Sequence, residues 1–310
     1  MFSRDEAKQH AMRLDLQQRP RATDDAIYHD FERRVEFRIG DLRDYHAVSS
    51  VLRTADVVVN AAAMKQVPSC EYFPYEAVQT NVAGAENLVR AIREHRLPVE
   101  AVVGVSTDKA CKPINVMGMT KAIQERVFAA ANLTVPETRF VCVRYGNVLA
   151  STGSVIPLFQ DQIRAGGPIT ITTLDMTRFL LPLERAVDAV LDAIEGAAAG
   201  EIWVPKVPSA RIVDVATALM AGRDVPIAVV GIRPGEKVHE VLVSSEEGWR
   251  TFERGDYLVI EPVLPELRAG RNAGPALDGD YSSADSLMTL DQTRELLDRH
   301  GLMHRRAAAA

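Results

Sequence analysis

A repeated alternation of short apolar runs with longer amphipathic segments is the feature that most constrains how this chain can fold. The apolar runs predict strands at residues 35–39, 57–59, 99–105 and 140–144. The segments between them predict helices at residues 45–52, 75–95 and 115–131. Near-continuous apolar strands that alternate with helices form parallel sheets covered on both faces. We therefore predict an α/β fold built on a doubly wound parallel sheet.

The pattern becomes less regular after residue 145, where loops rich in glycine and proline separate shorter elements. Helices are predicted at residues 155–165, 183–195, 211–220 and 290–300, and short strands at residues 169–171, 201–204 and 227–230. We expect residues 1–150 to carry the sheet and residues 151–310 to form a smaller mixed α/β lobe, with segments that return to the first. Residues 262–280 are rich in glycine, proline and charged residues, and this composition predicts a mobile connection. The tail from about residue 302 is expected to be disordered.

The bulk composition excludes several classes of protein. The 310 residues carry a net charge of −6 and a pI near 5.7, which argues against nucleic-acid binding because that function needs a basic surface. The 3 cysteines have no metal-ligand spacing, and they fit a reducing cytoplasm better than a disulfide framework. The chain has no apolar run of about 18 residues and is charged from Arg4 onward, so we expect neither a membrane span nor a signal peptide.

The stretch richest in chemistry follows the strand predicted at residues 99–105. Asp108 and Lys109 come directly after it, and Met117 and Lys121 lie four residues apart, hence on one face of the next helix. Ligands of open α/β sheets bind at the carboxyl ends of strands, where an acid and an amine can move two different protons. The alternative is a solvated loop with a capping aspartate. These residues alone leave both interpretations open.

Several short motifs occur in a family-like order along nearly the whole chain. They are Ser3-Arg4-Asp5-Glu6, Gly40-Asp41-Leu42-Arg43-Asp44, the run 61–71, Thr80-Asn81, the run 106–121, Arg144-Tyr145-Gly146-Asn147-Val148, the run 153–157, Met176-Thr177-Arg178-Phe179, the run 204–209, Ile232-Arg233-Pro234-Gly235-Glu236-Lys237 and Tyr281-Ser282-Ser283. The chain resembles the extended short-chain dehydrogenase/reductase superfamily. Within it, the chain is most similar to the soluble UDP-N-acetylglucosamine 4,6-dehydratases that invert C5. The resemblance implies a Rossmann-like, NADP-binding domain over residues 1–150 and a mainly substrate-binding lobe over residues 151–310.

Two departures from the family pattern matter. Met117 stands where the superfamily has a tyrosine, and a thioether has no titratable proton, so Met117 is neither general acid nor base. Some members of the dehydratase family also carry methionine there. The glycine-rich turn that receives the cofactor pyrophosphate has no counterpart, because the first glycine is Gly40. We expect Met1 to be an internal methionine of a longer protein; the alternative is a truncated chain with exposed strand edges.

The resemblance implies an internal redox reaction. NADP⁺ takes a hydride from sugar C4, the 4-ketone acidifies the C5 proton, the C6 hydroxyl leaves, and the hydride returns to C6. Asp108 is implied to be the C6 acid and Lys109 the C5 base, with burial or nearby Lys121 lowering the pKa of Lys109. Lys121 is also expected to bind the nicotinamide ribose and to take part in the proton transfer at C4. The alternative interpretation is an exposed lysine on a helix. Thr107 orients the C4 hydroxyl or simply caps a helix.

The resemblance implies NADP rather than NAD as the cofactor. Ser3, Arg4 and Lys8 follow the second strand of the family fold, where an arginine accommodates the 2′-phosphate of NADP. Asp41 and Leu42 are expected to flank the adenine. The nicotinamide side is implied to be formed by Ala61, Ala62, Ala63, Lys65, Asn81 and Lys121. Without the family match, the alanine run reads equally well as the small-residue end of a strand.

The implied partner is a UDP-sugar. Asn147 and Arg178 are candidates to bind it, because arginine forms charge-assisted bonds to phosphate. Arg233 and Glu236 are expected to bracket the uridine, and Lys65 to touch the sugar or pyrophosphate. The charged candidates also have an ordinary interpretation as surface ion pairs. We further expect a homo-oligomer in the cytoplasm with no nucleic-acid or membrane partner and no metal.

Three functions are compatible with these residues. The first is a dehydratase that converts UDP-N-acetylglucosamine to a UDP-4-keto-6-deoxy sugar, with C5 inversion, in surface polysaccharide or glycan biosynthesis. The second is a UDP-sugar 4-epimerase of the same superfamily, which has no use for a C6 acid and a C5 base and normally needs the tyrosine. The third is a truncated, non-catalytic nucleotide-binding homologue. The Asp108–Lys109 pair favours the first.

Overall fold

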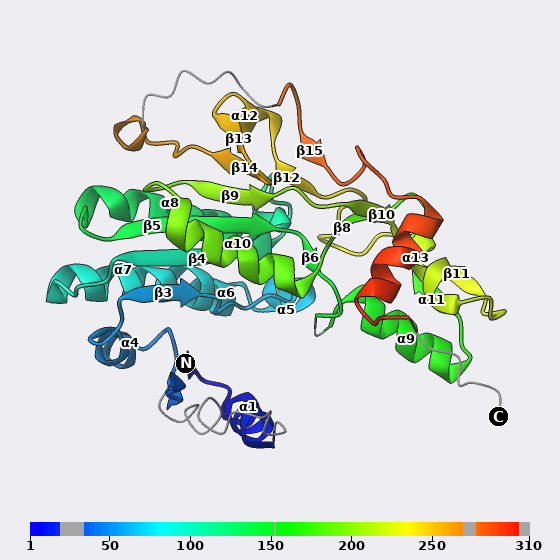
Figure 1. Cartoon of the computed structure of the whole chain (residues 1–310), viewed down its shortest axis with the longest axis horizontal. Coiled ribbons are helices and arrows are strands. Elements are labelled where there is room, and N and C mark those ends of the chain that lie inside the picture. Colours follow the sequence, from blue (N-terminus) through cyan, green and yellow to red (C-terminus); the bar gives the residue numbers. More distant parts are fainter. Residues whose placement is uncertain (19–33, 152, 269–276, 304–310) are drawn as a thin grey trace, which may run out of the picture.

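A six-stranded sheet runs through the larger part of the molecule (Figure 1). The computed structural model describes residues 1–18, 34–151, 153–268 and 277–303. The strand order is β13-β14-β9-β5-β4-β3. The parallel strands are β3 (Val57–Asn60), β4 (Ala101–Thr107), β5 (Arg139–Tyr145) and β9 (Ile202–Pro205). An antiparallel hairpin that we did not predict extends the sheet with β14 (Tyr257–Ile260) and β13 (Thr251–Arg254).

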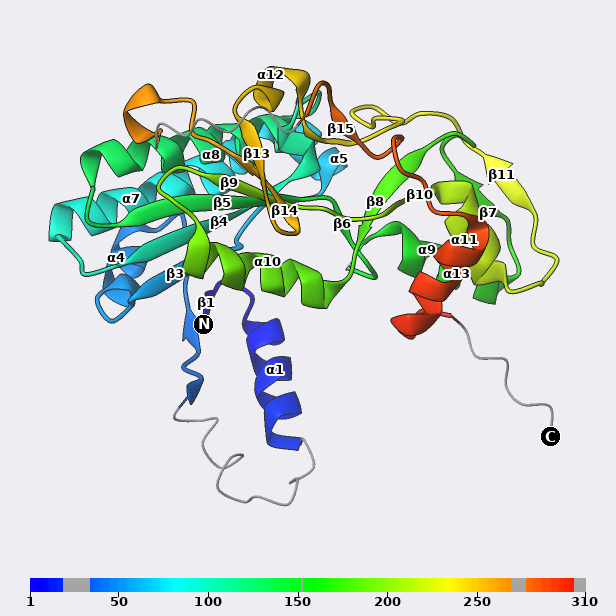
Figure 2. The same cartoon turned by 45° about the horizontal axis from the view of Figure 1, so that its top comes forward.

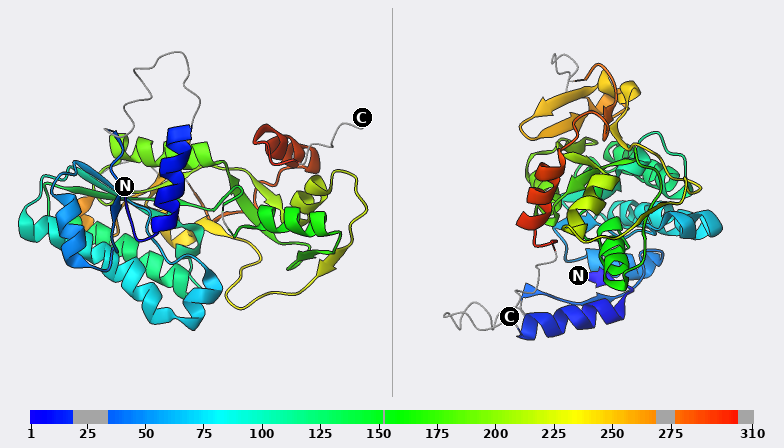
Figure 3. Two further views of the ribbon diagram at one scale, coloured as in Figure 1. Left: turned by 90° about the horizontal axis from the view of Figure 1, so that it is seen from below. Right: turned by 90° about the vertical axis from the view of Figure 1, so that its right-hand side faces the viewer.

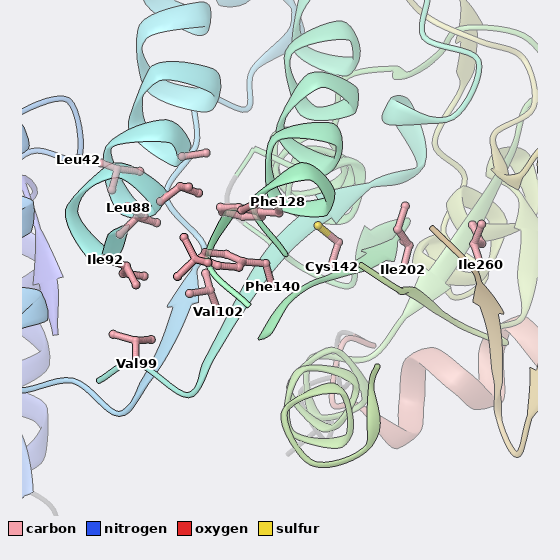
Figure 4. Packing of buried hydrophobic residues seen from close by; sticks show 14 of the residues in the cluster. Leu42, Leu88, Ile92, Val99, Val102, Phe128, Phe140, Cys142, Ile202 and Ile260 are labelled. Carbon is pink, nitrogen blue, oxygen red and sulfur yellow. The ribbon is translucent and has the colours of Figure 1, made fainter. Parts of the chain in front are cut away.

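Alternate residues of the central strands face two separate apolar cores, because side chains along a strand point to opposite faces. Val102, Phe140 and Cys142 pack against helices α4 (Tyr45–Leu52), α7 (Gly84–His95) and α8 (Val116–Thr134), as Figure 4 shows for several of these side chains. On the other face, Val103 and Val141 pack beneath α10 (Leu183–Gly196). Helices therefore cover both faces of the sheet, as the alternating sequence pattern predicts.

The helix predicted at residues 75–95 is not one uniform α-helix. It starts as α6 (Pro74–Val78), passes through a π-helical turn, η1 (Gln79–Ala83), and continues as α7. A short helix that we did not predict, α5 (Val67–Tyr72), precedes it. A π turn holds one residue more than an α turn and is frequent at functional sites. Here it carries the buried side chains of Thr80 and Asn81.

The chain after β5 builds a second apolar core beside one end of the sheet (Figure 3). Its helices are α9 (Val155–Ala165), α11 (Ile212–Met220) and α13 (Leu290–Arg299). Its strands are β6 (Asn147–Val148), β7 (Ile169–Ile171), β8 (Thr177–Leu181), β10 (Ser209–Arg211) and β11 (Ile227–Val229), which form the sheets β10-β8-β6 and β11-β7. We call this part the second lobe. Strands β9, β13 and β14, although late in the sequence, belong to the large sheet.

The N-terminal residues form a separate two-stranded parallel ribbon. It consists of β1 (Phe2–Ser3) and β2 (Arg38–Ile39), so the strand predicted at residues 35–39 is shorter than expected. Helix α1 (Glu6–Gln18) projects away from the large sheet (Figure 2). Within the described residues no strand pairs with the outer edge of β3, whose Val57 and Val59 are 38% and 46% exposed. This edge presents unpaired backbone groups.

The remaining elements pack mainly against the large sheet and its core, to which Leu242, Val243 and Tyr281 contribute. Strand β12 (Val241–Val243) pairs with β15 (Tyr281–Ser282), and α12 (Ser245–Gly248) follows β12. The connection predicted at residues 262–280 contains a short 3₁₀ helix, η3 (Pro265–Leu267), while its residues 269–276 lie outside the described part. Leu302 and Met303 pack against the second core, and the rest of the predicted tail, residues 304–310, also lies outside the described residues.

A buried ionic network joins the sheet to the helices around it. The Arg144 guanidinium, at the end of β5, donates to both carboxylate oxygens of Glu125 on α8 at 2.9 and 2.7 Å. It also donates to both oxygens of Glu247 on α12 at 2.7 and 2.9 Å. Ser106 on β4 donates to the same Glu125 at 2.6 Å. Arg144 is only 1% exposed, so removing it would leave two buried carboxylates without their positively charged partner.

We therefore expect Arg144→Ala to lower the free energy of unfolding by about 3–5 kcal/mol, the usual cost of breaking a buried ion pair. Urea unfolding followed by circular dichroism measures this quantity. Arg294→Ala is the matched control, because Arg294 is 45% exposed and pairs with the exposed Asp291 at 3.1 Å; it should cost less than about 1 kcal/mol. Equal effects of the two substitutions would contradict a structural role for the network.

Candidate active site at the carboxyl ends of the parallel strands

The parallel strands point their carboxyl ends toward the second lobe (Figure 1). β4 ends at Thr107, and a single 3₁₀ turn, η2 (Asp108–Ala110), follows at once. The Thr107 hydroxyl donates to Asp108 Oδ1 at 2.8 Å, and Lys109 Nζ donates to the same oxygen at 3.0 Å. The Asp108 side chain is 1% exposed and that of Lys109 is 22% exposed. An acid and an amine therefore stand side by side in the position that the sequence predicted.

Gly118 lets this turn lie directly on the first turn of α8. A Cβ atom at Gly118 would stand 2.1 Å from the carbonyl oxygen of Lys109, which no real contact allows. The helix begins one turn earlier with Asn115, whose side chain accepts from the Gly118 backbone N–H at 2.8 Å. Asn115 also donates to the Gly235 carbonyl at 2.8 Å. The cap of α8 thus binds η2 and a loop of the second lobe in one place.

Glu240, which we did not predict, contributes a third charged group from the chain just before β12. Its Oε1 lies 3.5 Å from Lys109 Nζ and 3.7 Å from Arg178 Nε. The Arg178 guanidinium on β8 donates to the backbone carbonyls of Thr177 and Val238, at 2.7 and 3.0 Å, and to that of Lys237 at 2.9 Å. These bonds favour a structural role for Arg178, so its expected contact with phosphate stays a prediction.

The charges around Lys109 correct one expectation. Burial alone would lower the pKa of the Lys109 amine, but the carboxylates of Asp108 and Glu240 outweigh burial and the opposing Arg178, so the pKa lies above its usual value. Lys121 is not among the groups that act on it. The prediction that burial or Lys121 lowers the pKa of Lys109 is therefore wrong for this arrangement, because the two neighbouring carboxylates favour the charged amine more than burial disfavours it.

Lys121 is the amine that burial does perturb. Its side chain is buried on α8, 4% exposed, and Nζ donates to Gln124 Oε1. Desolvation lowers the pKa of Lys121 from 10.5 to about 8, against weaker opposing effects of Cys142 and Glu125. An exposed helix lysine, the alternative to a site residue, is thus not what the structure contains. Gln124 lies three residues after Lys121, a helical spacing that could have revealed it from sequence.

Met117 faces a small apolar cluster rather than an ionisable group. It is 6% exposed and packs with Cys70 and Ala77. The backbone carbonyl of Met117 accepts from the Thr120 hydroxyl at 2.9 Å, and that hydroxyl accepts from Asn81 at 2.9 Å. Asn81 also exchanges two bonds with the backbone of Met64, at 2.8 and 3.0 Å. The π turn thereby fastens the loop after β3 to α8 beside Lys121.

Four buried polar atoms near these residues have no hydrogen-bond partner among the described residues: Asp108 Oδ2, Gln124 Nε2, Asn147 Oδ1 and Glu240 Oε2. Only Ser154 Oγ and Thr173 Oγ1 share this property in the described part of the chain. Leaving such a group unpaired costs about 1–3 kcal/mol, so native structures contain few of them. Their concentration at the carboxyl ends of β4 and β5 indicates a site that receives polar groups from a ligand.

The residues expected around the nicotinamide are suited to the nicotinamide end of a dinucleotide. Ala61, Ala62 and Ala63 follow β3 and are exposed, so no side chain beyond a methyl group blocks an approach to the backbone there. Lys65 is exposed in the same loop. Asn81 ties this loop to α8, and Lys121 with the unpartnered Gln124 amide supplies buried donors. These groups would hold the ribose and nicotinamide of a dinucleotide.

The residues expected around the adenosine end lie on the N-terminal ribbon. Arg4 and Lys8 are exposed, with Arg4 3.6 Å from Asp41 and Lys8 3.2 Å from Asp5. Such surface pairs are worth little and can be exchanged for a phosphate. Ser3 is half-buried in β1, and Leu42 is 8% exposed in the main core rather than open to a ring. The charges fit a 2′-phosphate, whereas Leu42 fits an adenine less well than expected.

The expected uridine residues lie on the second lobe. Arg233 is exposed, and its backbone N–H donates to Glu236 Oε2 at 3.3 Å. The Thr172 hydroxyl donates to the same oxygen at 3.2 Å. Asn147 begins β6, directly after Gly146, at which a Cβ would approach Asp108 Oδ2 to 3.3 Å. Asn147 thus directly follows a residue that lies close to the acid in space, whereas Arg233 and Glu236 are carried by a separate loop.

Among the described residues, no group of three or more His, Cys, Asp or Glu side chains could hold a metal ion. None of the helices in this part of the chain is both long enough and apolar enough to cross a membrane.

A family model described as a polysaccharide biosynthesis protein matches residues 1–262. The chain belongs to this family. A UDP-glucose 4-epimerase of Rickettsia canadensis (strain McKiel) is 41% identical over 307 residues, which cover 96% of this chain and 85% of that protein. The X-ray structure of Pen from Bacillus thuringiensis superposes with a TM-score of 0.84 at 33% identity, over 96% of this chain and 89% of Pen.

The polysaccharide biosynthesis family is one of dehydratase- and epimerase-like short-chain dehydrogenase/reductases, so the superfamily resemblance is confirmed. DesIV, a dTDP-glucose 4,6-dehydratase from Streptomyces venezuelae, superposes with a TM-score of 0.62 over 67% of this chain and 71% of DesIV. At 22% identity this likeness shows the fold alone. The predicted α/β, Rossmann-like parallel sheet is confirmed. The narrower assignment to a UDP-N-acetylglucosamine dehydratase stays a prediction.

Gly118→Ala tests the contact between η2 and α8. By helix propensity alone, alanine would stabilise the helix by about 1 kcal/mol. Because the new methyl group meets a backbone carbonyl at 2.1 Å, we expect a net loss of about 1–3 kcal/mol in the free energy of unfolding. Gly167→Ala is the control, since no atom lies within 4 Å of its Cβ position. A stabilised Gly118→Ala protein would refute the close contact.

Lys121→Met tests the burial of that amine. The folded-state pKa of about 8 lies below the unfolded value of 10.5, so the folded chain binds fewer protons between these pH values and its stability rises with pH there. At pH 7 the full penalty is present, and Lys121→Met should be more stable by up to about 3 kcal/mol. The difference should shrink as the pH rises from 8 to 10. Urea unfolding at several pH values measures it, with Lys206→Met as the control, because the Lys206 side chain is 36% exposed and pairs with Glu253 at 2.9 Å; a pH-independent difference would contradict the burial of Lys121.

Proposed function

We propose that this protein is a nucleotide-sugar 4,6-dehydratase that converts UDP-N-acetylglucosamine to a UDP-4-keto-6-deoxy sugar, with inversion at C5, for surface polysaccharide or glycan synthesis. The single observation that carries the proposal is the buried Asp108–Lys109 pair at the end of β4, with Asp108 Oδ2 free of any partner within the described residues. Elimination of water from a sugar needs an acid for the leaving hydroxyl and a base for the carbon proton. A buried carboxyl beside an amine meets both needs.

The residues at the end of β4 and on α8 have distinct tasks in this proposal. Bound NADP would accept a hydride from the sugar and return it to the same sugar, so no external oxidant is consumed. Lys121 holds the ribose and, with its pKa near 8, is partly neutral at physiological pH and able to accept the C4 hydroxyl proton. Thr107 orients that hydroxyl, and Asp108 protonates the leaving C6 oxygen. Met117 packs, and it takes part in no proton transfer.

Lys109 is the proposed C5 base, and its raised pKa sets a condition on that role. In the ligand-free arrangement the amine is held as an ammonium by Asp108 and Glu240. Lys109 becomes a base only after it gives up a proton. When substrate binds, a neighbouring carboxyl can become protonated or reorient, and either change permits this proton loss. Because the Asp108 and Glu240 carboxylates lie beside this amine and each keeps one oxygen without a partner among the described residues, the proton can be shared locally without reaching solvent.

For the substrate, the supporting features are the charges of the second lobe. Arg233 is an exposed cation that would bracket the uridine together with Glu236, whose carboxylate can accept from ribose hydroxyls. Asn147 adds an unpartnered amide oxygen next to the acid, and Lys65 is expected to reach the sugar or pyrophosphate. Arg178 remains a candidate for the phosphate only if it exchanges a backbone carbonyl for it. We also propose a homo-oligomer that works in the cytoplasm.

The second candidate is a UDP-sugar 4-epimerase, which the printed name of the Rickettsia canadensis relative favours. An epimerase needs one acid–base group at C4 and none at C5 and C6. The chain has Met117 where that group normally stands, and it carries a carboxyl–amine pair for which epimerisation has no use. These residues favour the dehydratase, while Lys121 is compatible with both. A non-catalytic nucleotide-binding protein is the third candidate.

Incubation of the full chain with NADP⁺ and UDP-N-acetylglucosamine, followed by mass spectrometry and proton NMR, separates the candidates. A dehydratase gives a product lighter by one water with a 6-methyl signal, and deuterium from D₂O enters at C5. An epimerase gives a product of unchanged mass with an altered C4 coupling. Binding without turnover, measured by calorimetry, would support the third candidate and refute the proposal.

Asp108→Asn keeps the shape of the side chain and removes the acid. We expect it to lower kcat by about 10²–10⁴-fold, the usual worth of a general acid, with little change in the affinity for UDP-sugar. Steady-state kinetics and calorimetry measure the two quantities. Asp161→Asn is the control, because that carboxylate is 66% exposed on α9. An Asp108→Asn protein that retains full turnover would show that the acid is elsewhere.

A further inference from the structure

Glu240 is a buried acid with an unusual set of neighbours. It is 2% exposed, and one oxygen, Oε1, lies between two cations, Lys109 Nζ at 3.5 Å and Arg178 Nε at 3.7 Å. The other oxygen, Oε2, is buried and has no hydrogen-bond partner in the described part of the chain. An acid kept only for stability would use both oxygens, because an unpaired one is costly.

The backbone around Glu240 is held rigidly from three sides. Its N–H donates to Ser283 Oγ at 2.9 Å, and Ser283 shares a 2.7 Å bond with the Thr177 hydroxyl on β8. Arg178 holds the carbonyls of Lys237 and Val238, as described above. The Lys237 amine in turn donates to the Cys111 carbonyl, just after η2, at 2.7 Å. The segment 237–240 therefore bridges η2 of the large sheet and β8 of the second lobe.

The charged groups facing the Lys109 amine are few. Asp108 comes from η2, Glu240 from the segment before β12, and Arg178 from β8. Two other ionisable side chains of the segment are committed elsewhere, Lys237 to the Cys111 carbonyl and His239, through Nδ1, to the Thr177 hydroxyl at 2.8 Å. Asp108 touches Lys109 from the same turn, so Glu240 is the acid that reaches it from a distant part of the chain, the segment before β12.

We propose that Glu240 is a positioning residue that clamps the Lys109 ammonium against Asp108 from the segment before β12 and thereby fixes both the place and the charge of that amine. The proposal rests on the dehydratase function only for its effect on turnover. Its effect on Lys109 itself follows from the geometry. Glu240 contacts the proposed base directly, so in this proposal it acts through Lys109.

Glu240→Gln keeps the volume of the side chain and removes the charge. An opposite charge within about 4–6 Å shifts a pKa by about 1–3 pH units, so the pH at which the Lys109 amine is half reactive toward an acetylating reagent should fall by about one unit. Peptide mass spectrometry of the full chain, labelled over a pH series, measures this midpoint without any turnover. Glu240→Asp retains the charge and should keep the midpoint closer to that of the wild type.

Glu246→Gln is the matched control, because Glu246 is 73% exposed and pairs with Lys112 at 3.7 Å. It should leave the Lys109 midpoint unchanged. A Glu240→Gln protein with an unchanged midpoint would overturn the inference, even if that protein were less stable. An equal shift in the control would overturn it as well.

Kinetics separate this inference from the proposed function. If the protein is a dehydratase, Glu240→Gln should move the rising limb of the kcat–pH profile to lower pH and reduce the plateau about tenfold, with KM nearly constant. A raised KM with unchanged kcat would mean that Glu240 binds the sugar directly, against the inference. If the wild type turns over no UDP-sugar but the labelling midpoint still shifts, the proposed function fails while the role of Glu240 stands.

Discussion

The contact between the Lys109 carbonyl and the first turn of α8 holds the candidate site together. It exists because residue 118 has no side chain, so the turn after β4 can lie on the helix that carries Met117 and Lys121. A second close approach supports it deeper in the core, where Gly104 of β4 lies against the ring of Phe128 on α8. Strand and helix are therefore in contact over much of their common length. The distance between the two lysines is set by backbone packing, which relaxes less readily than side chains do.

The two amines of the site differ in charge because of their surroundings. Lys109 lies beside two carboxylates and stays protonated, whereas Lys121 is buried next to an amide and loses its proton more easily. Pairs of titratable groups whose surroundings push their pKa values apart are typical of catalytic sites. Here the segment before β12, which is tied to β8 through Arg178, supplies one of the two acids, so the position of that segment decides how strongly the amines differ.

The sequence predicted the elements that obey simple periodicity. Helices α4 and α9 begin and end where we expected, and β4 and β5 deviate by two residues at most. The hairpin β13–β14 was not predicted although Gly255-Asp256 is a typical two-residue turn. All four residues of β14 are buried, so the alternation that marks a half-exposed strand is missing.

The candidate site was predictable to the extent that its residues are close together in the chain. Asp108, Lys109 and Lys121 stand in one motif, whereas Glu240 follows more than a hundred residues later and meets them only through the fold. The same limit explains the error on the pKa of Lys109. Burial can be predicted for a residue that follows an apolar strand. The Glu240 carboxylate, however, lies beside Lys109 only because a distant segment of the chain packs there in the folded structure.

The π-helical turn between α6 and α7 has a geometric consequence of its own. Each residue advances an α-helix by about 100°, so one additional residue rotates everything after it by that angle relative to everything before. Ala77, before the turn, faces the cluster around Met117, while Leu88 and Ile92, after it, face the main core above Val102. The continuous helical segment α6–η1–α7 thus presents its apolar side to the Met117 cluster before the π turn and to the main core after it. Deleting one residue here would restore ideal helix geometry, but it would also rotate one of these two apolar faces toward solvent.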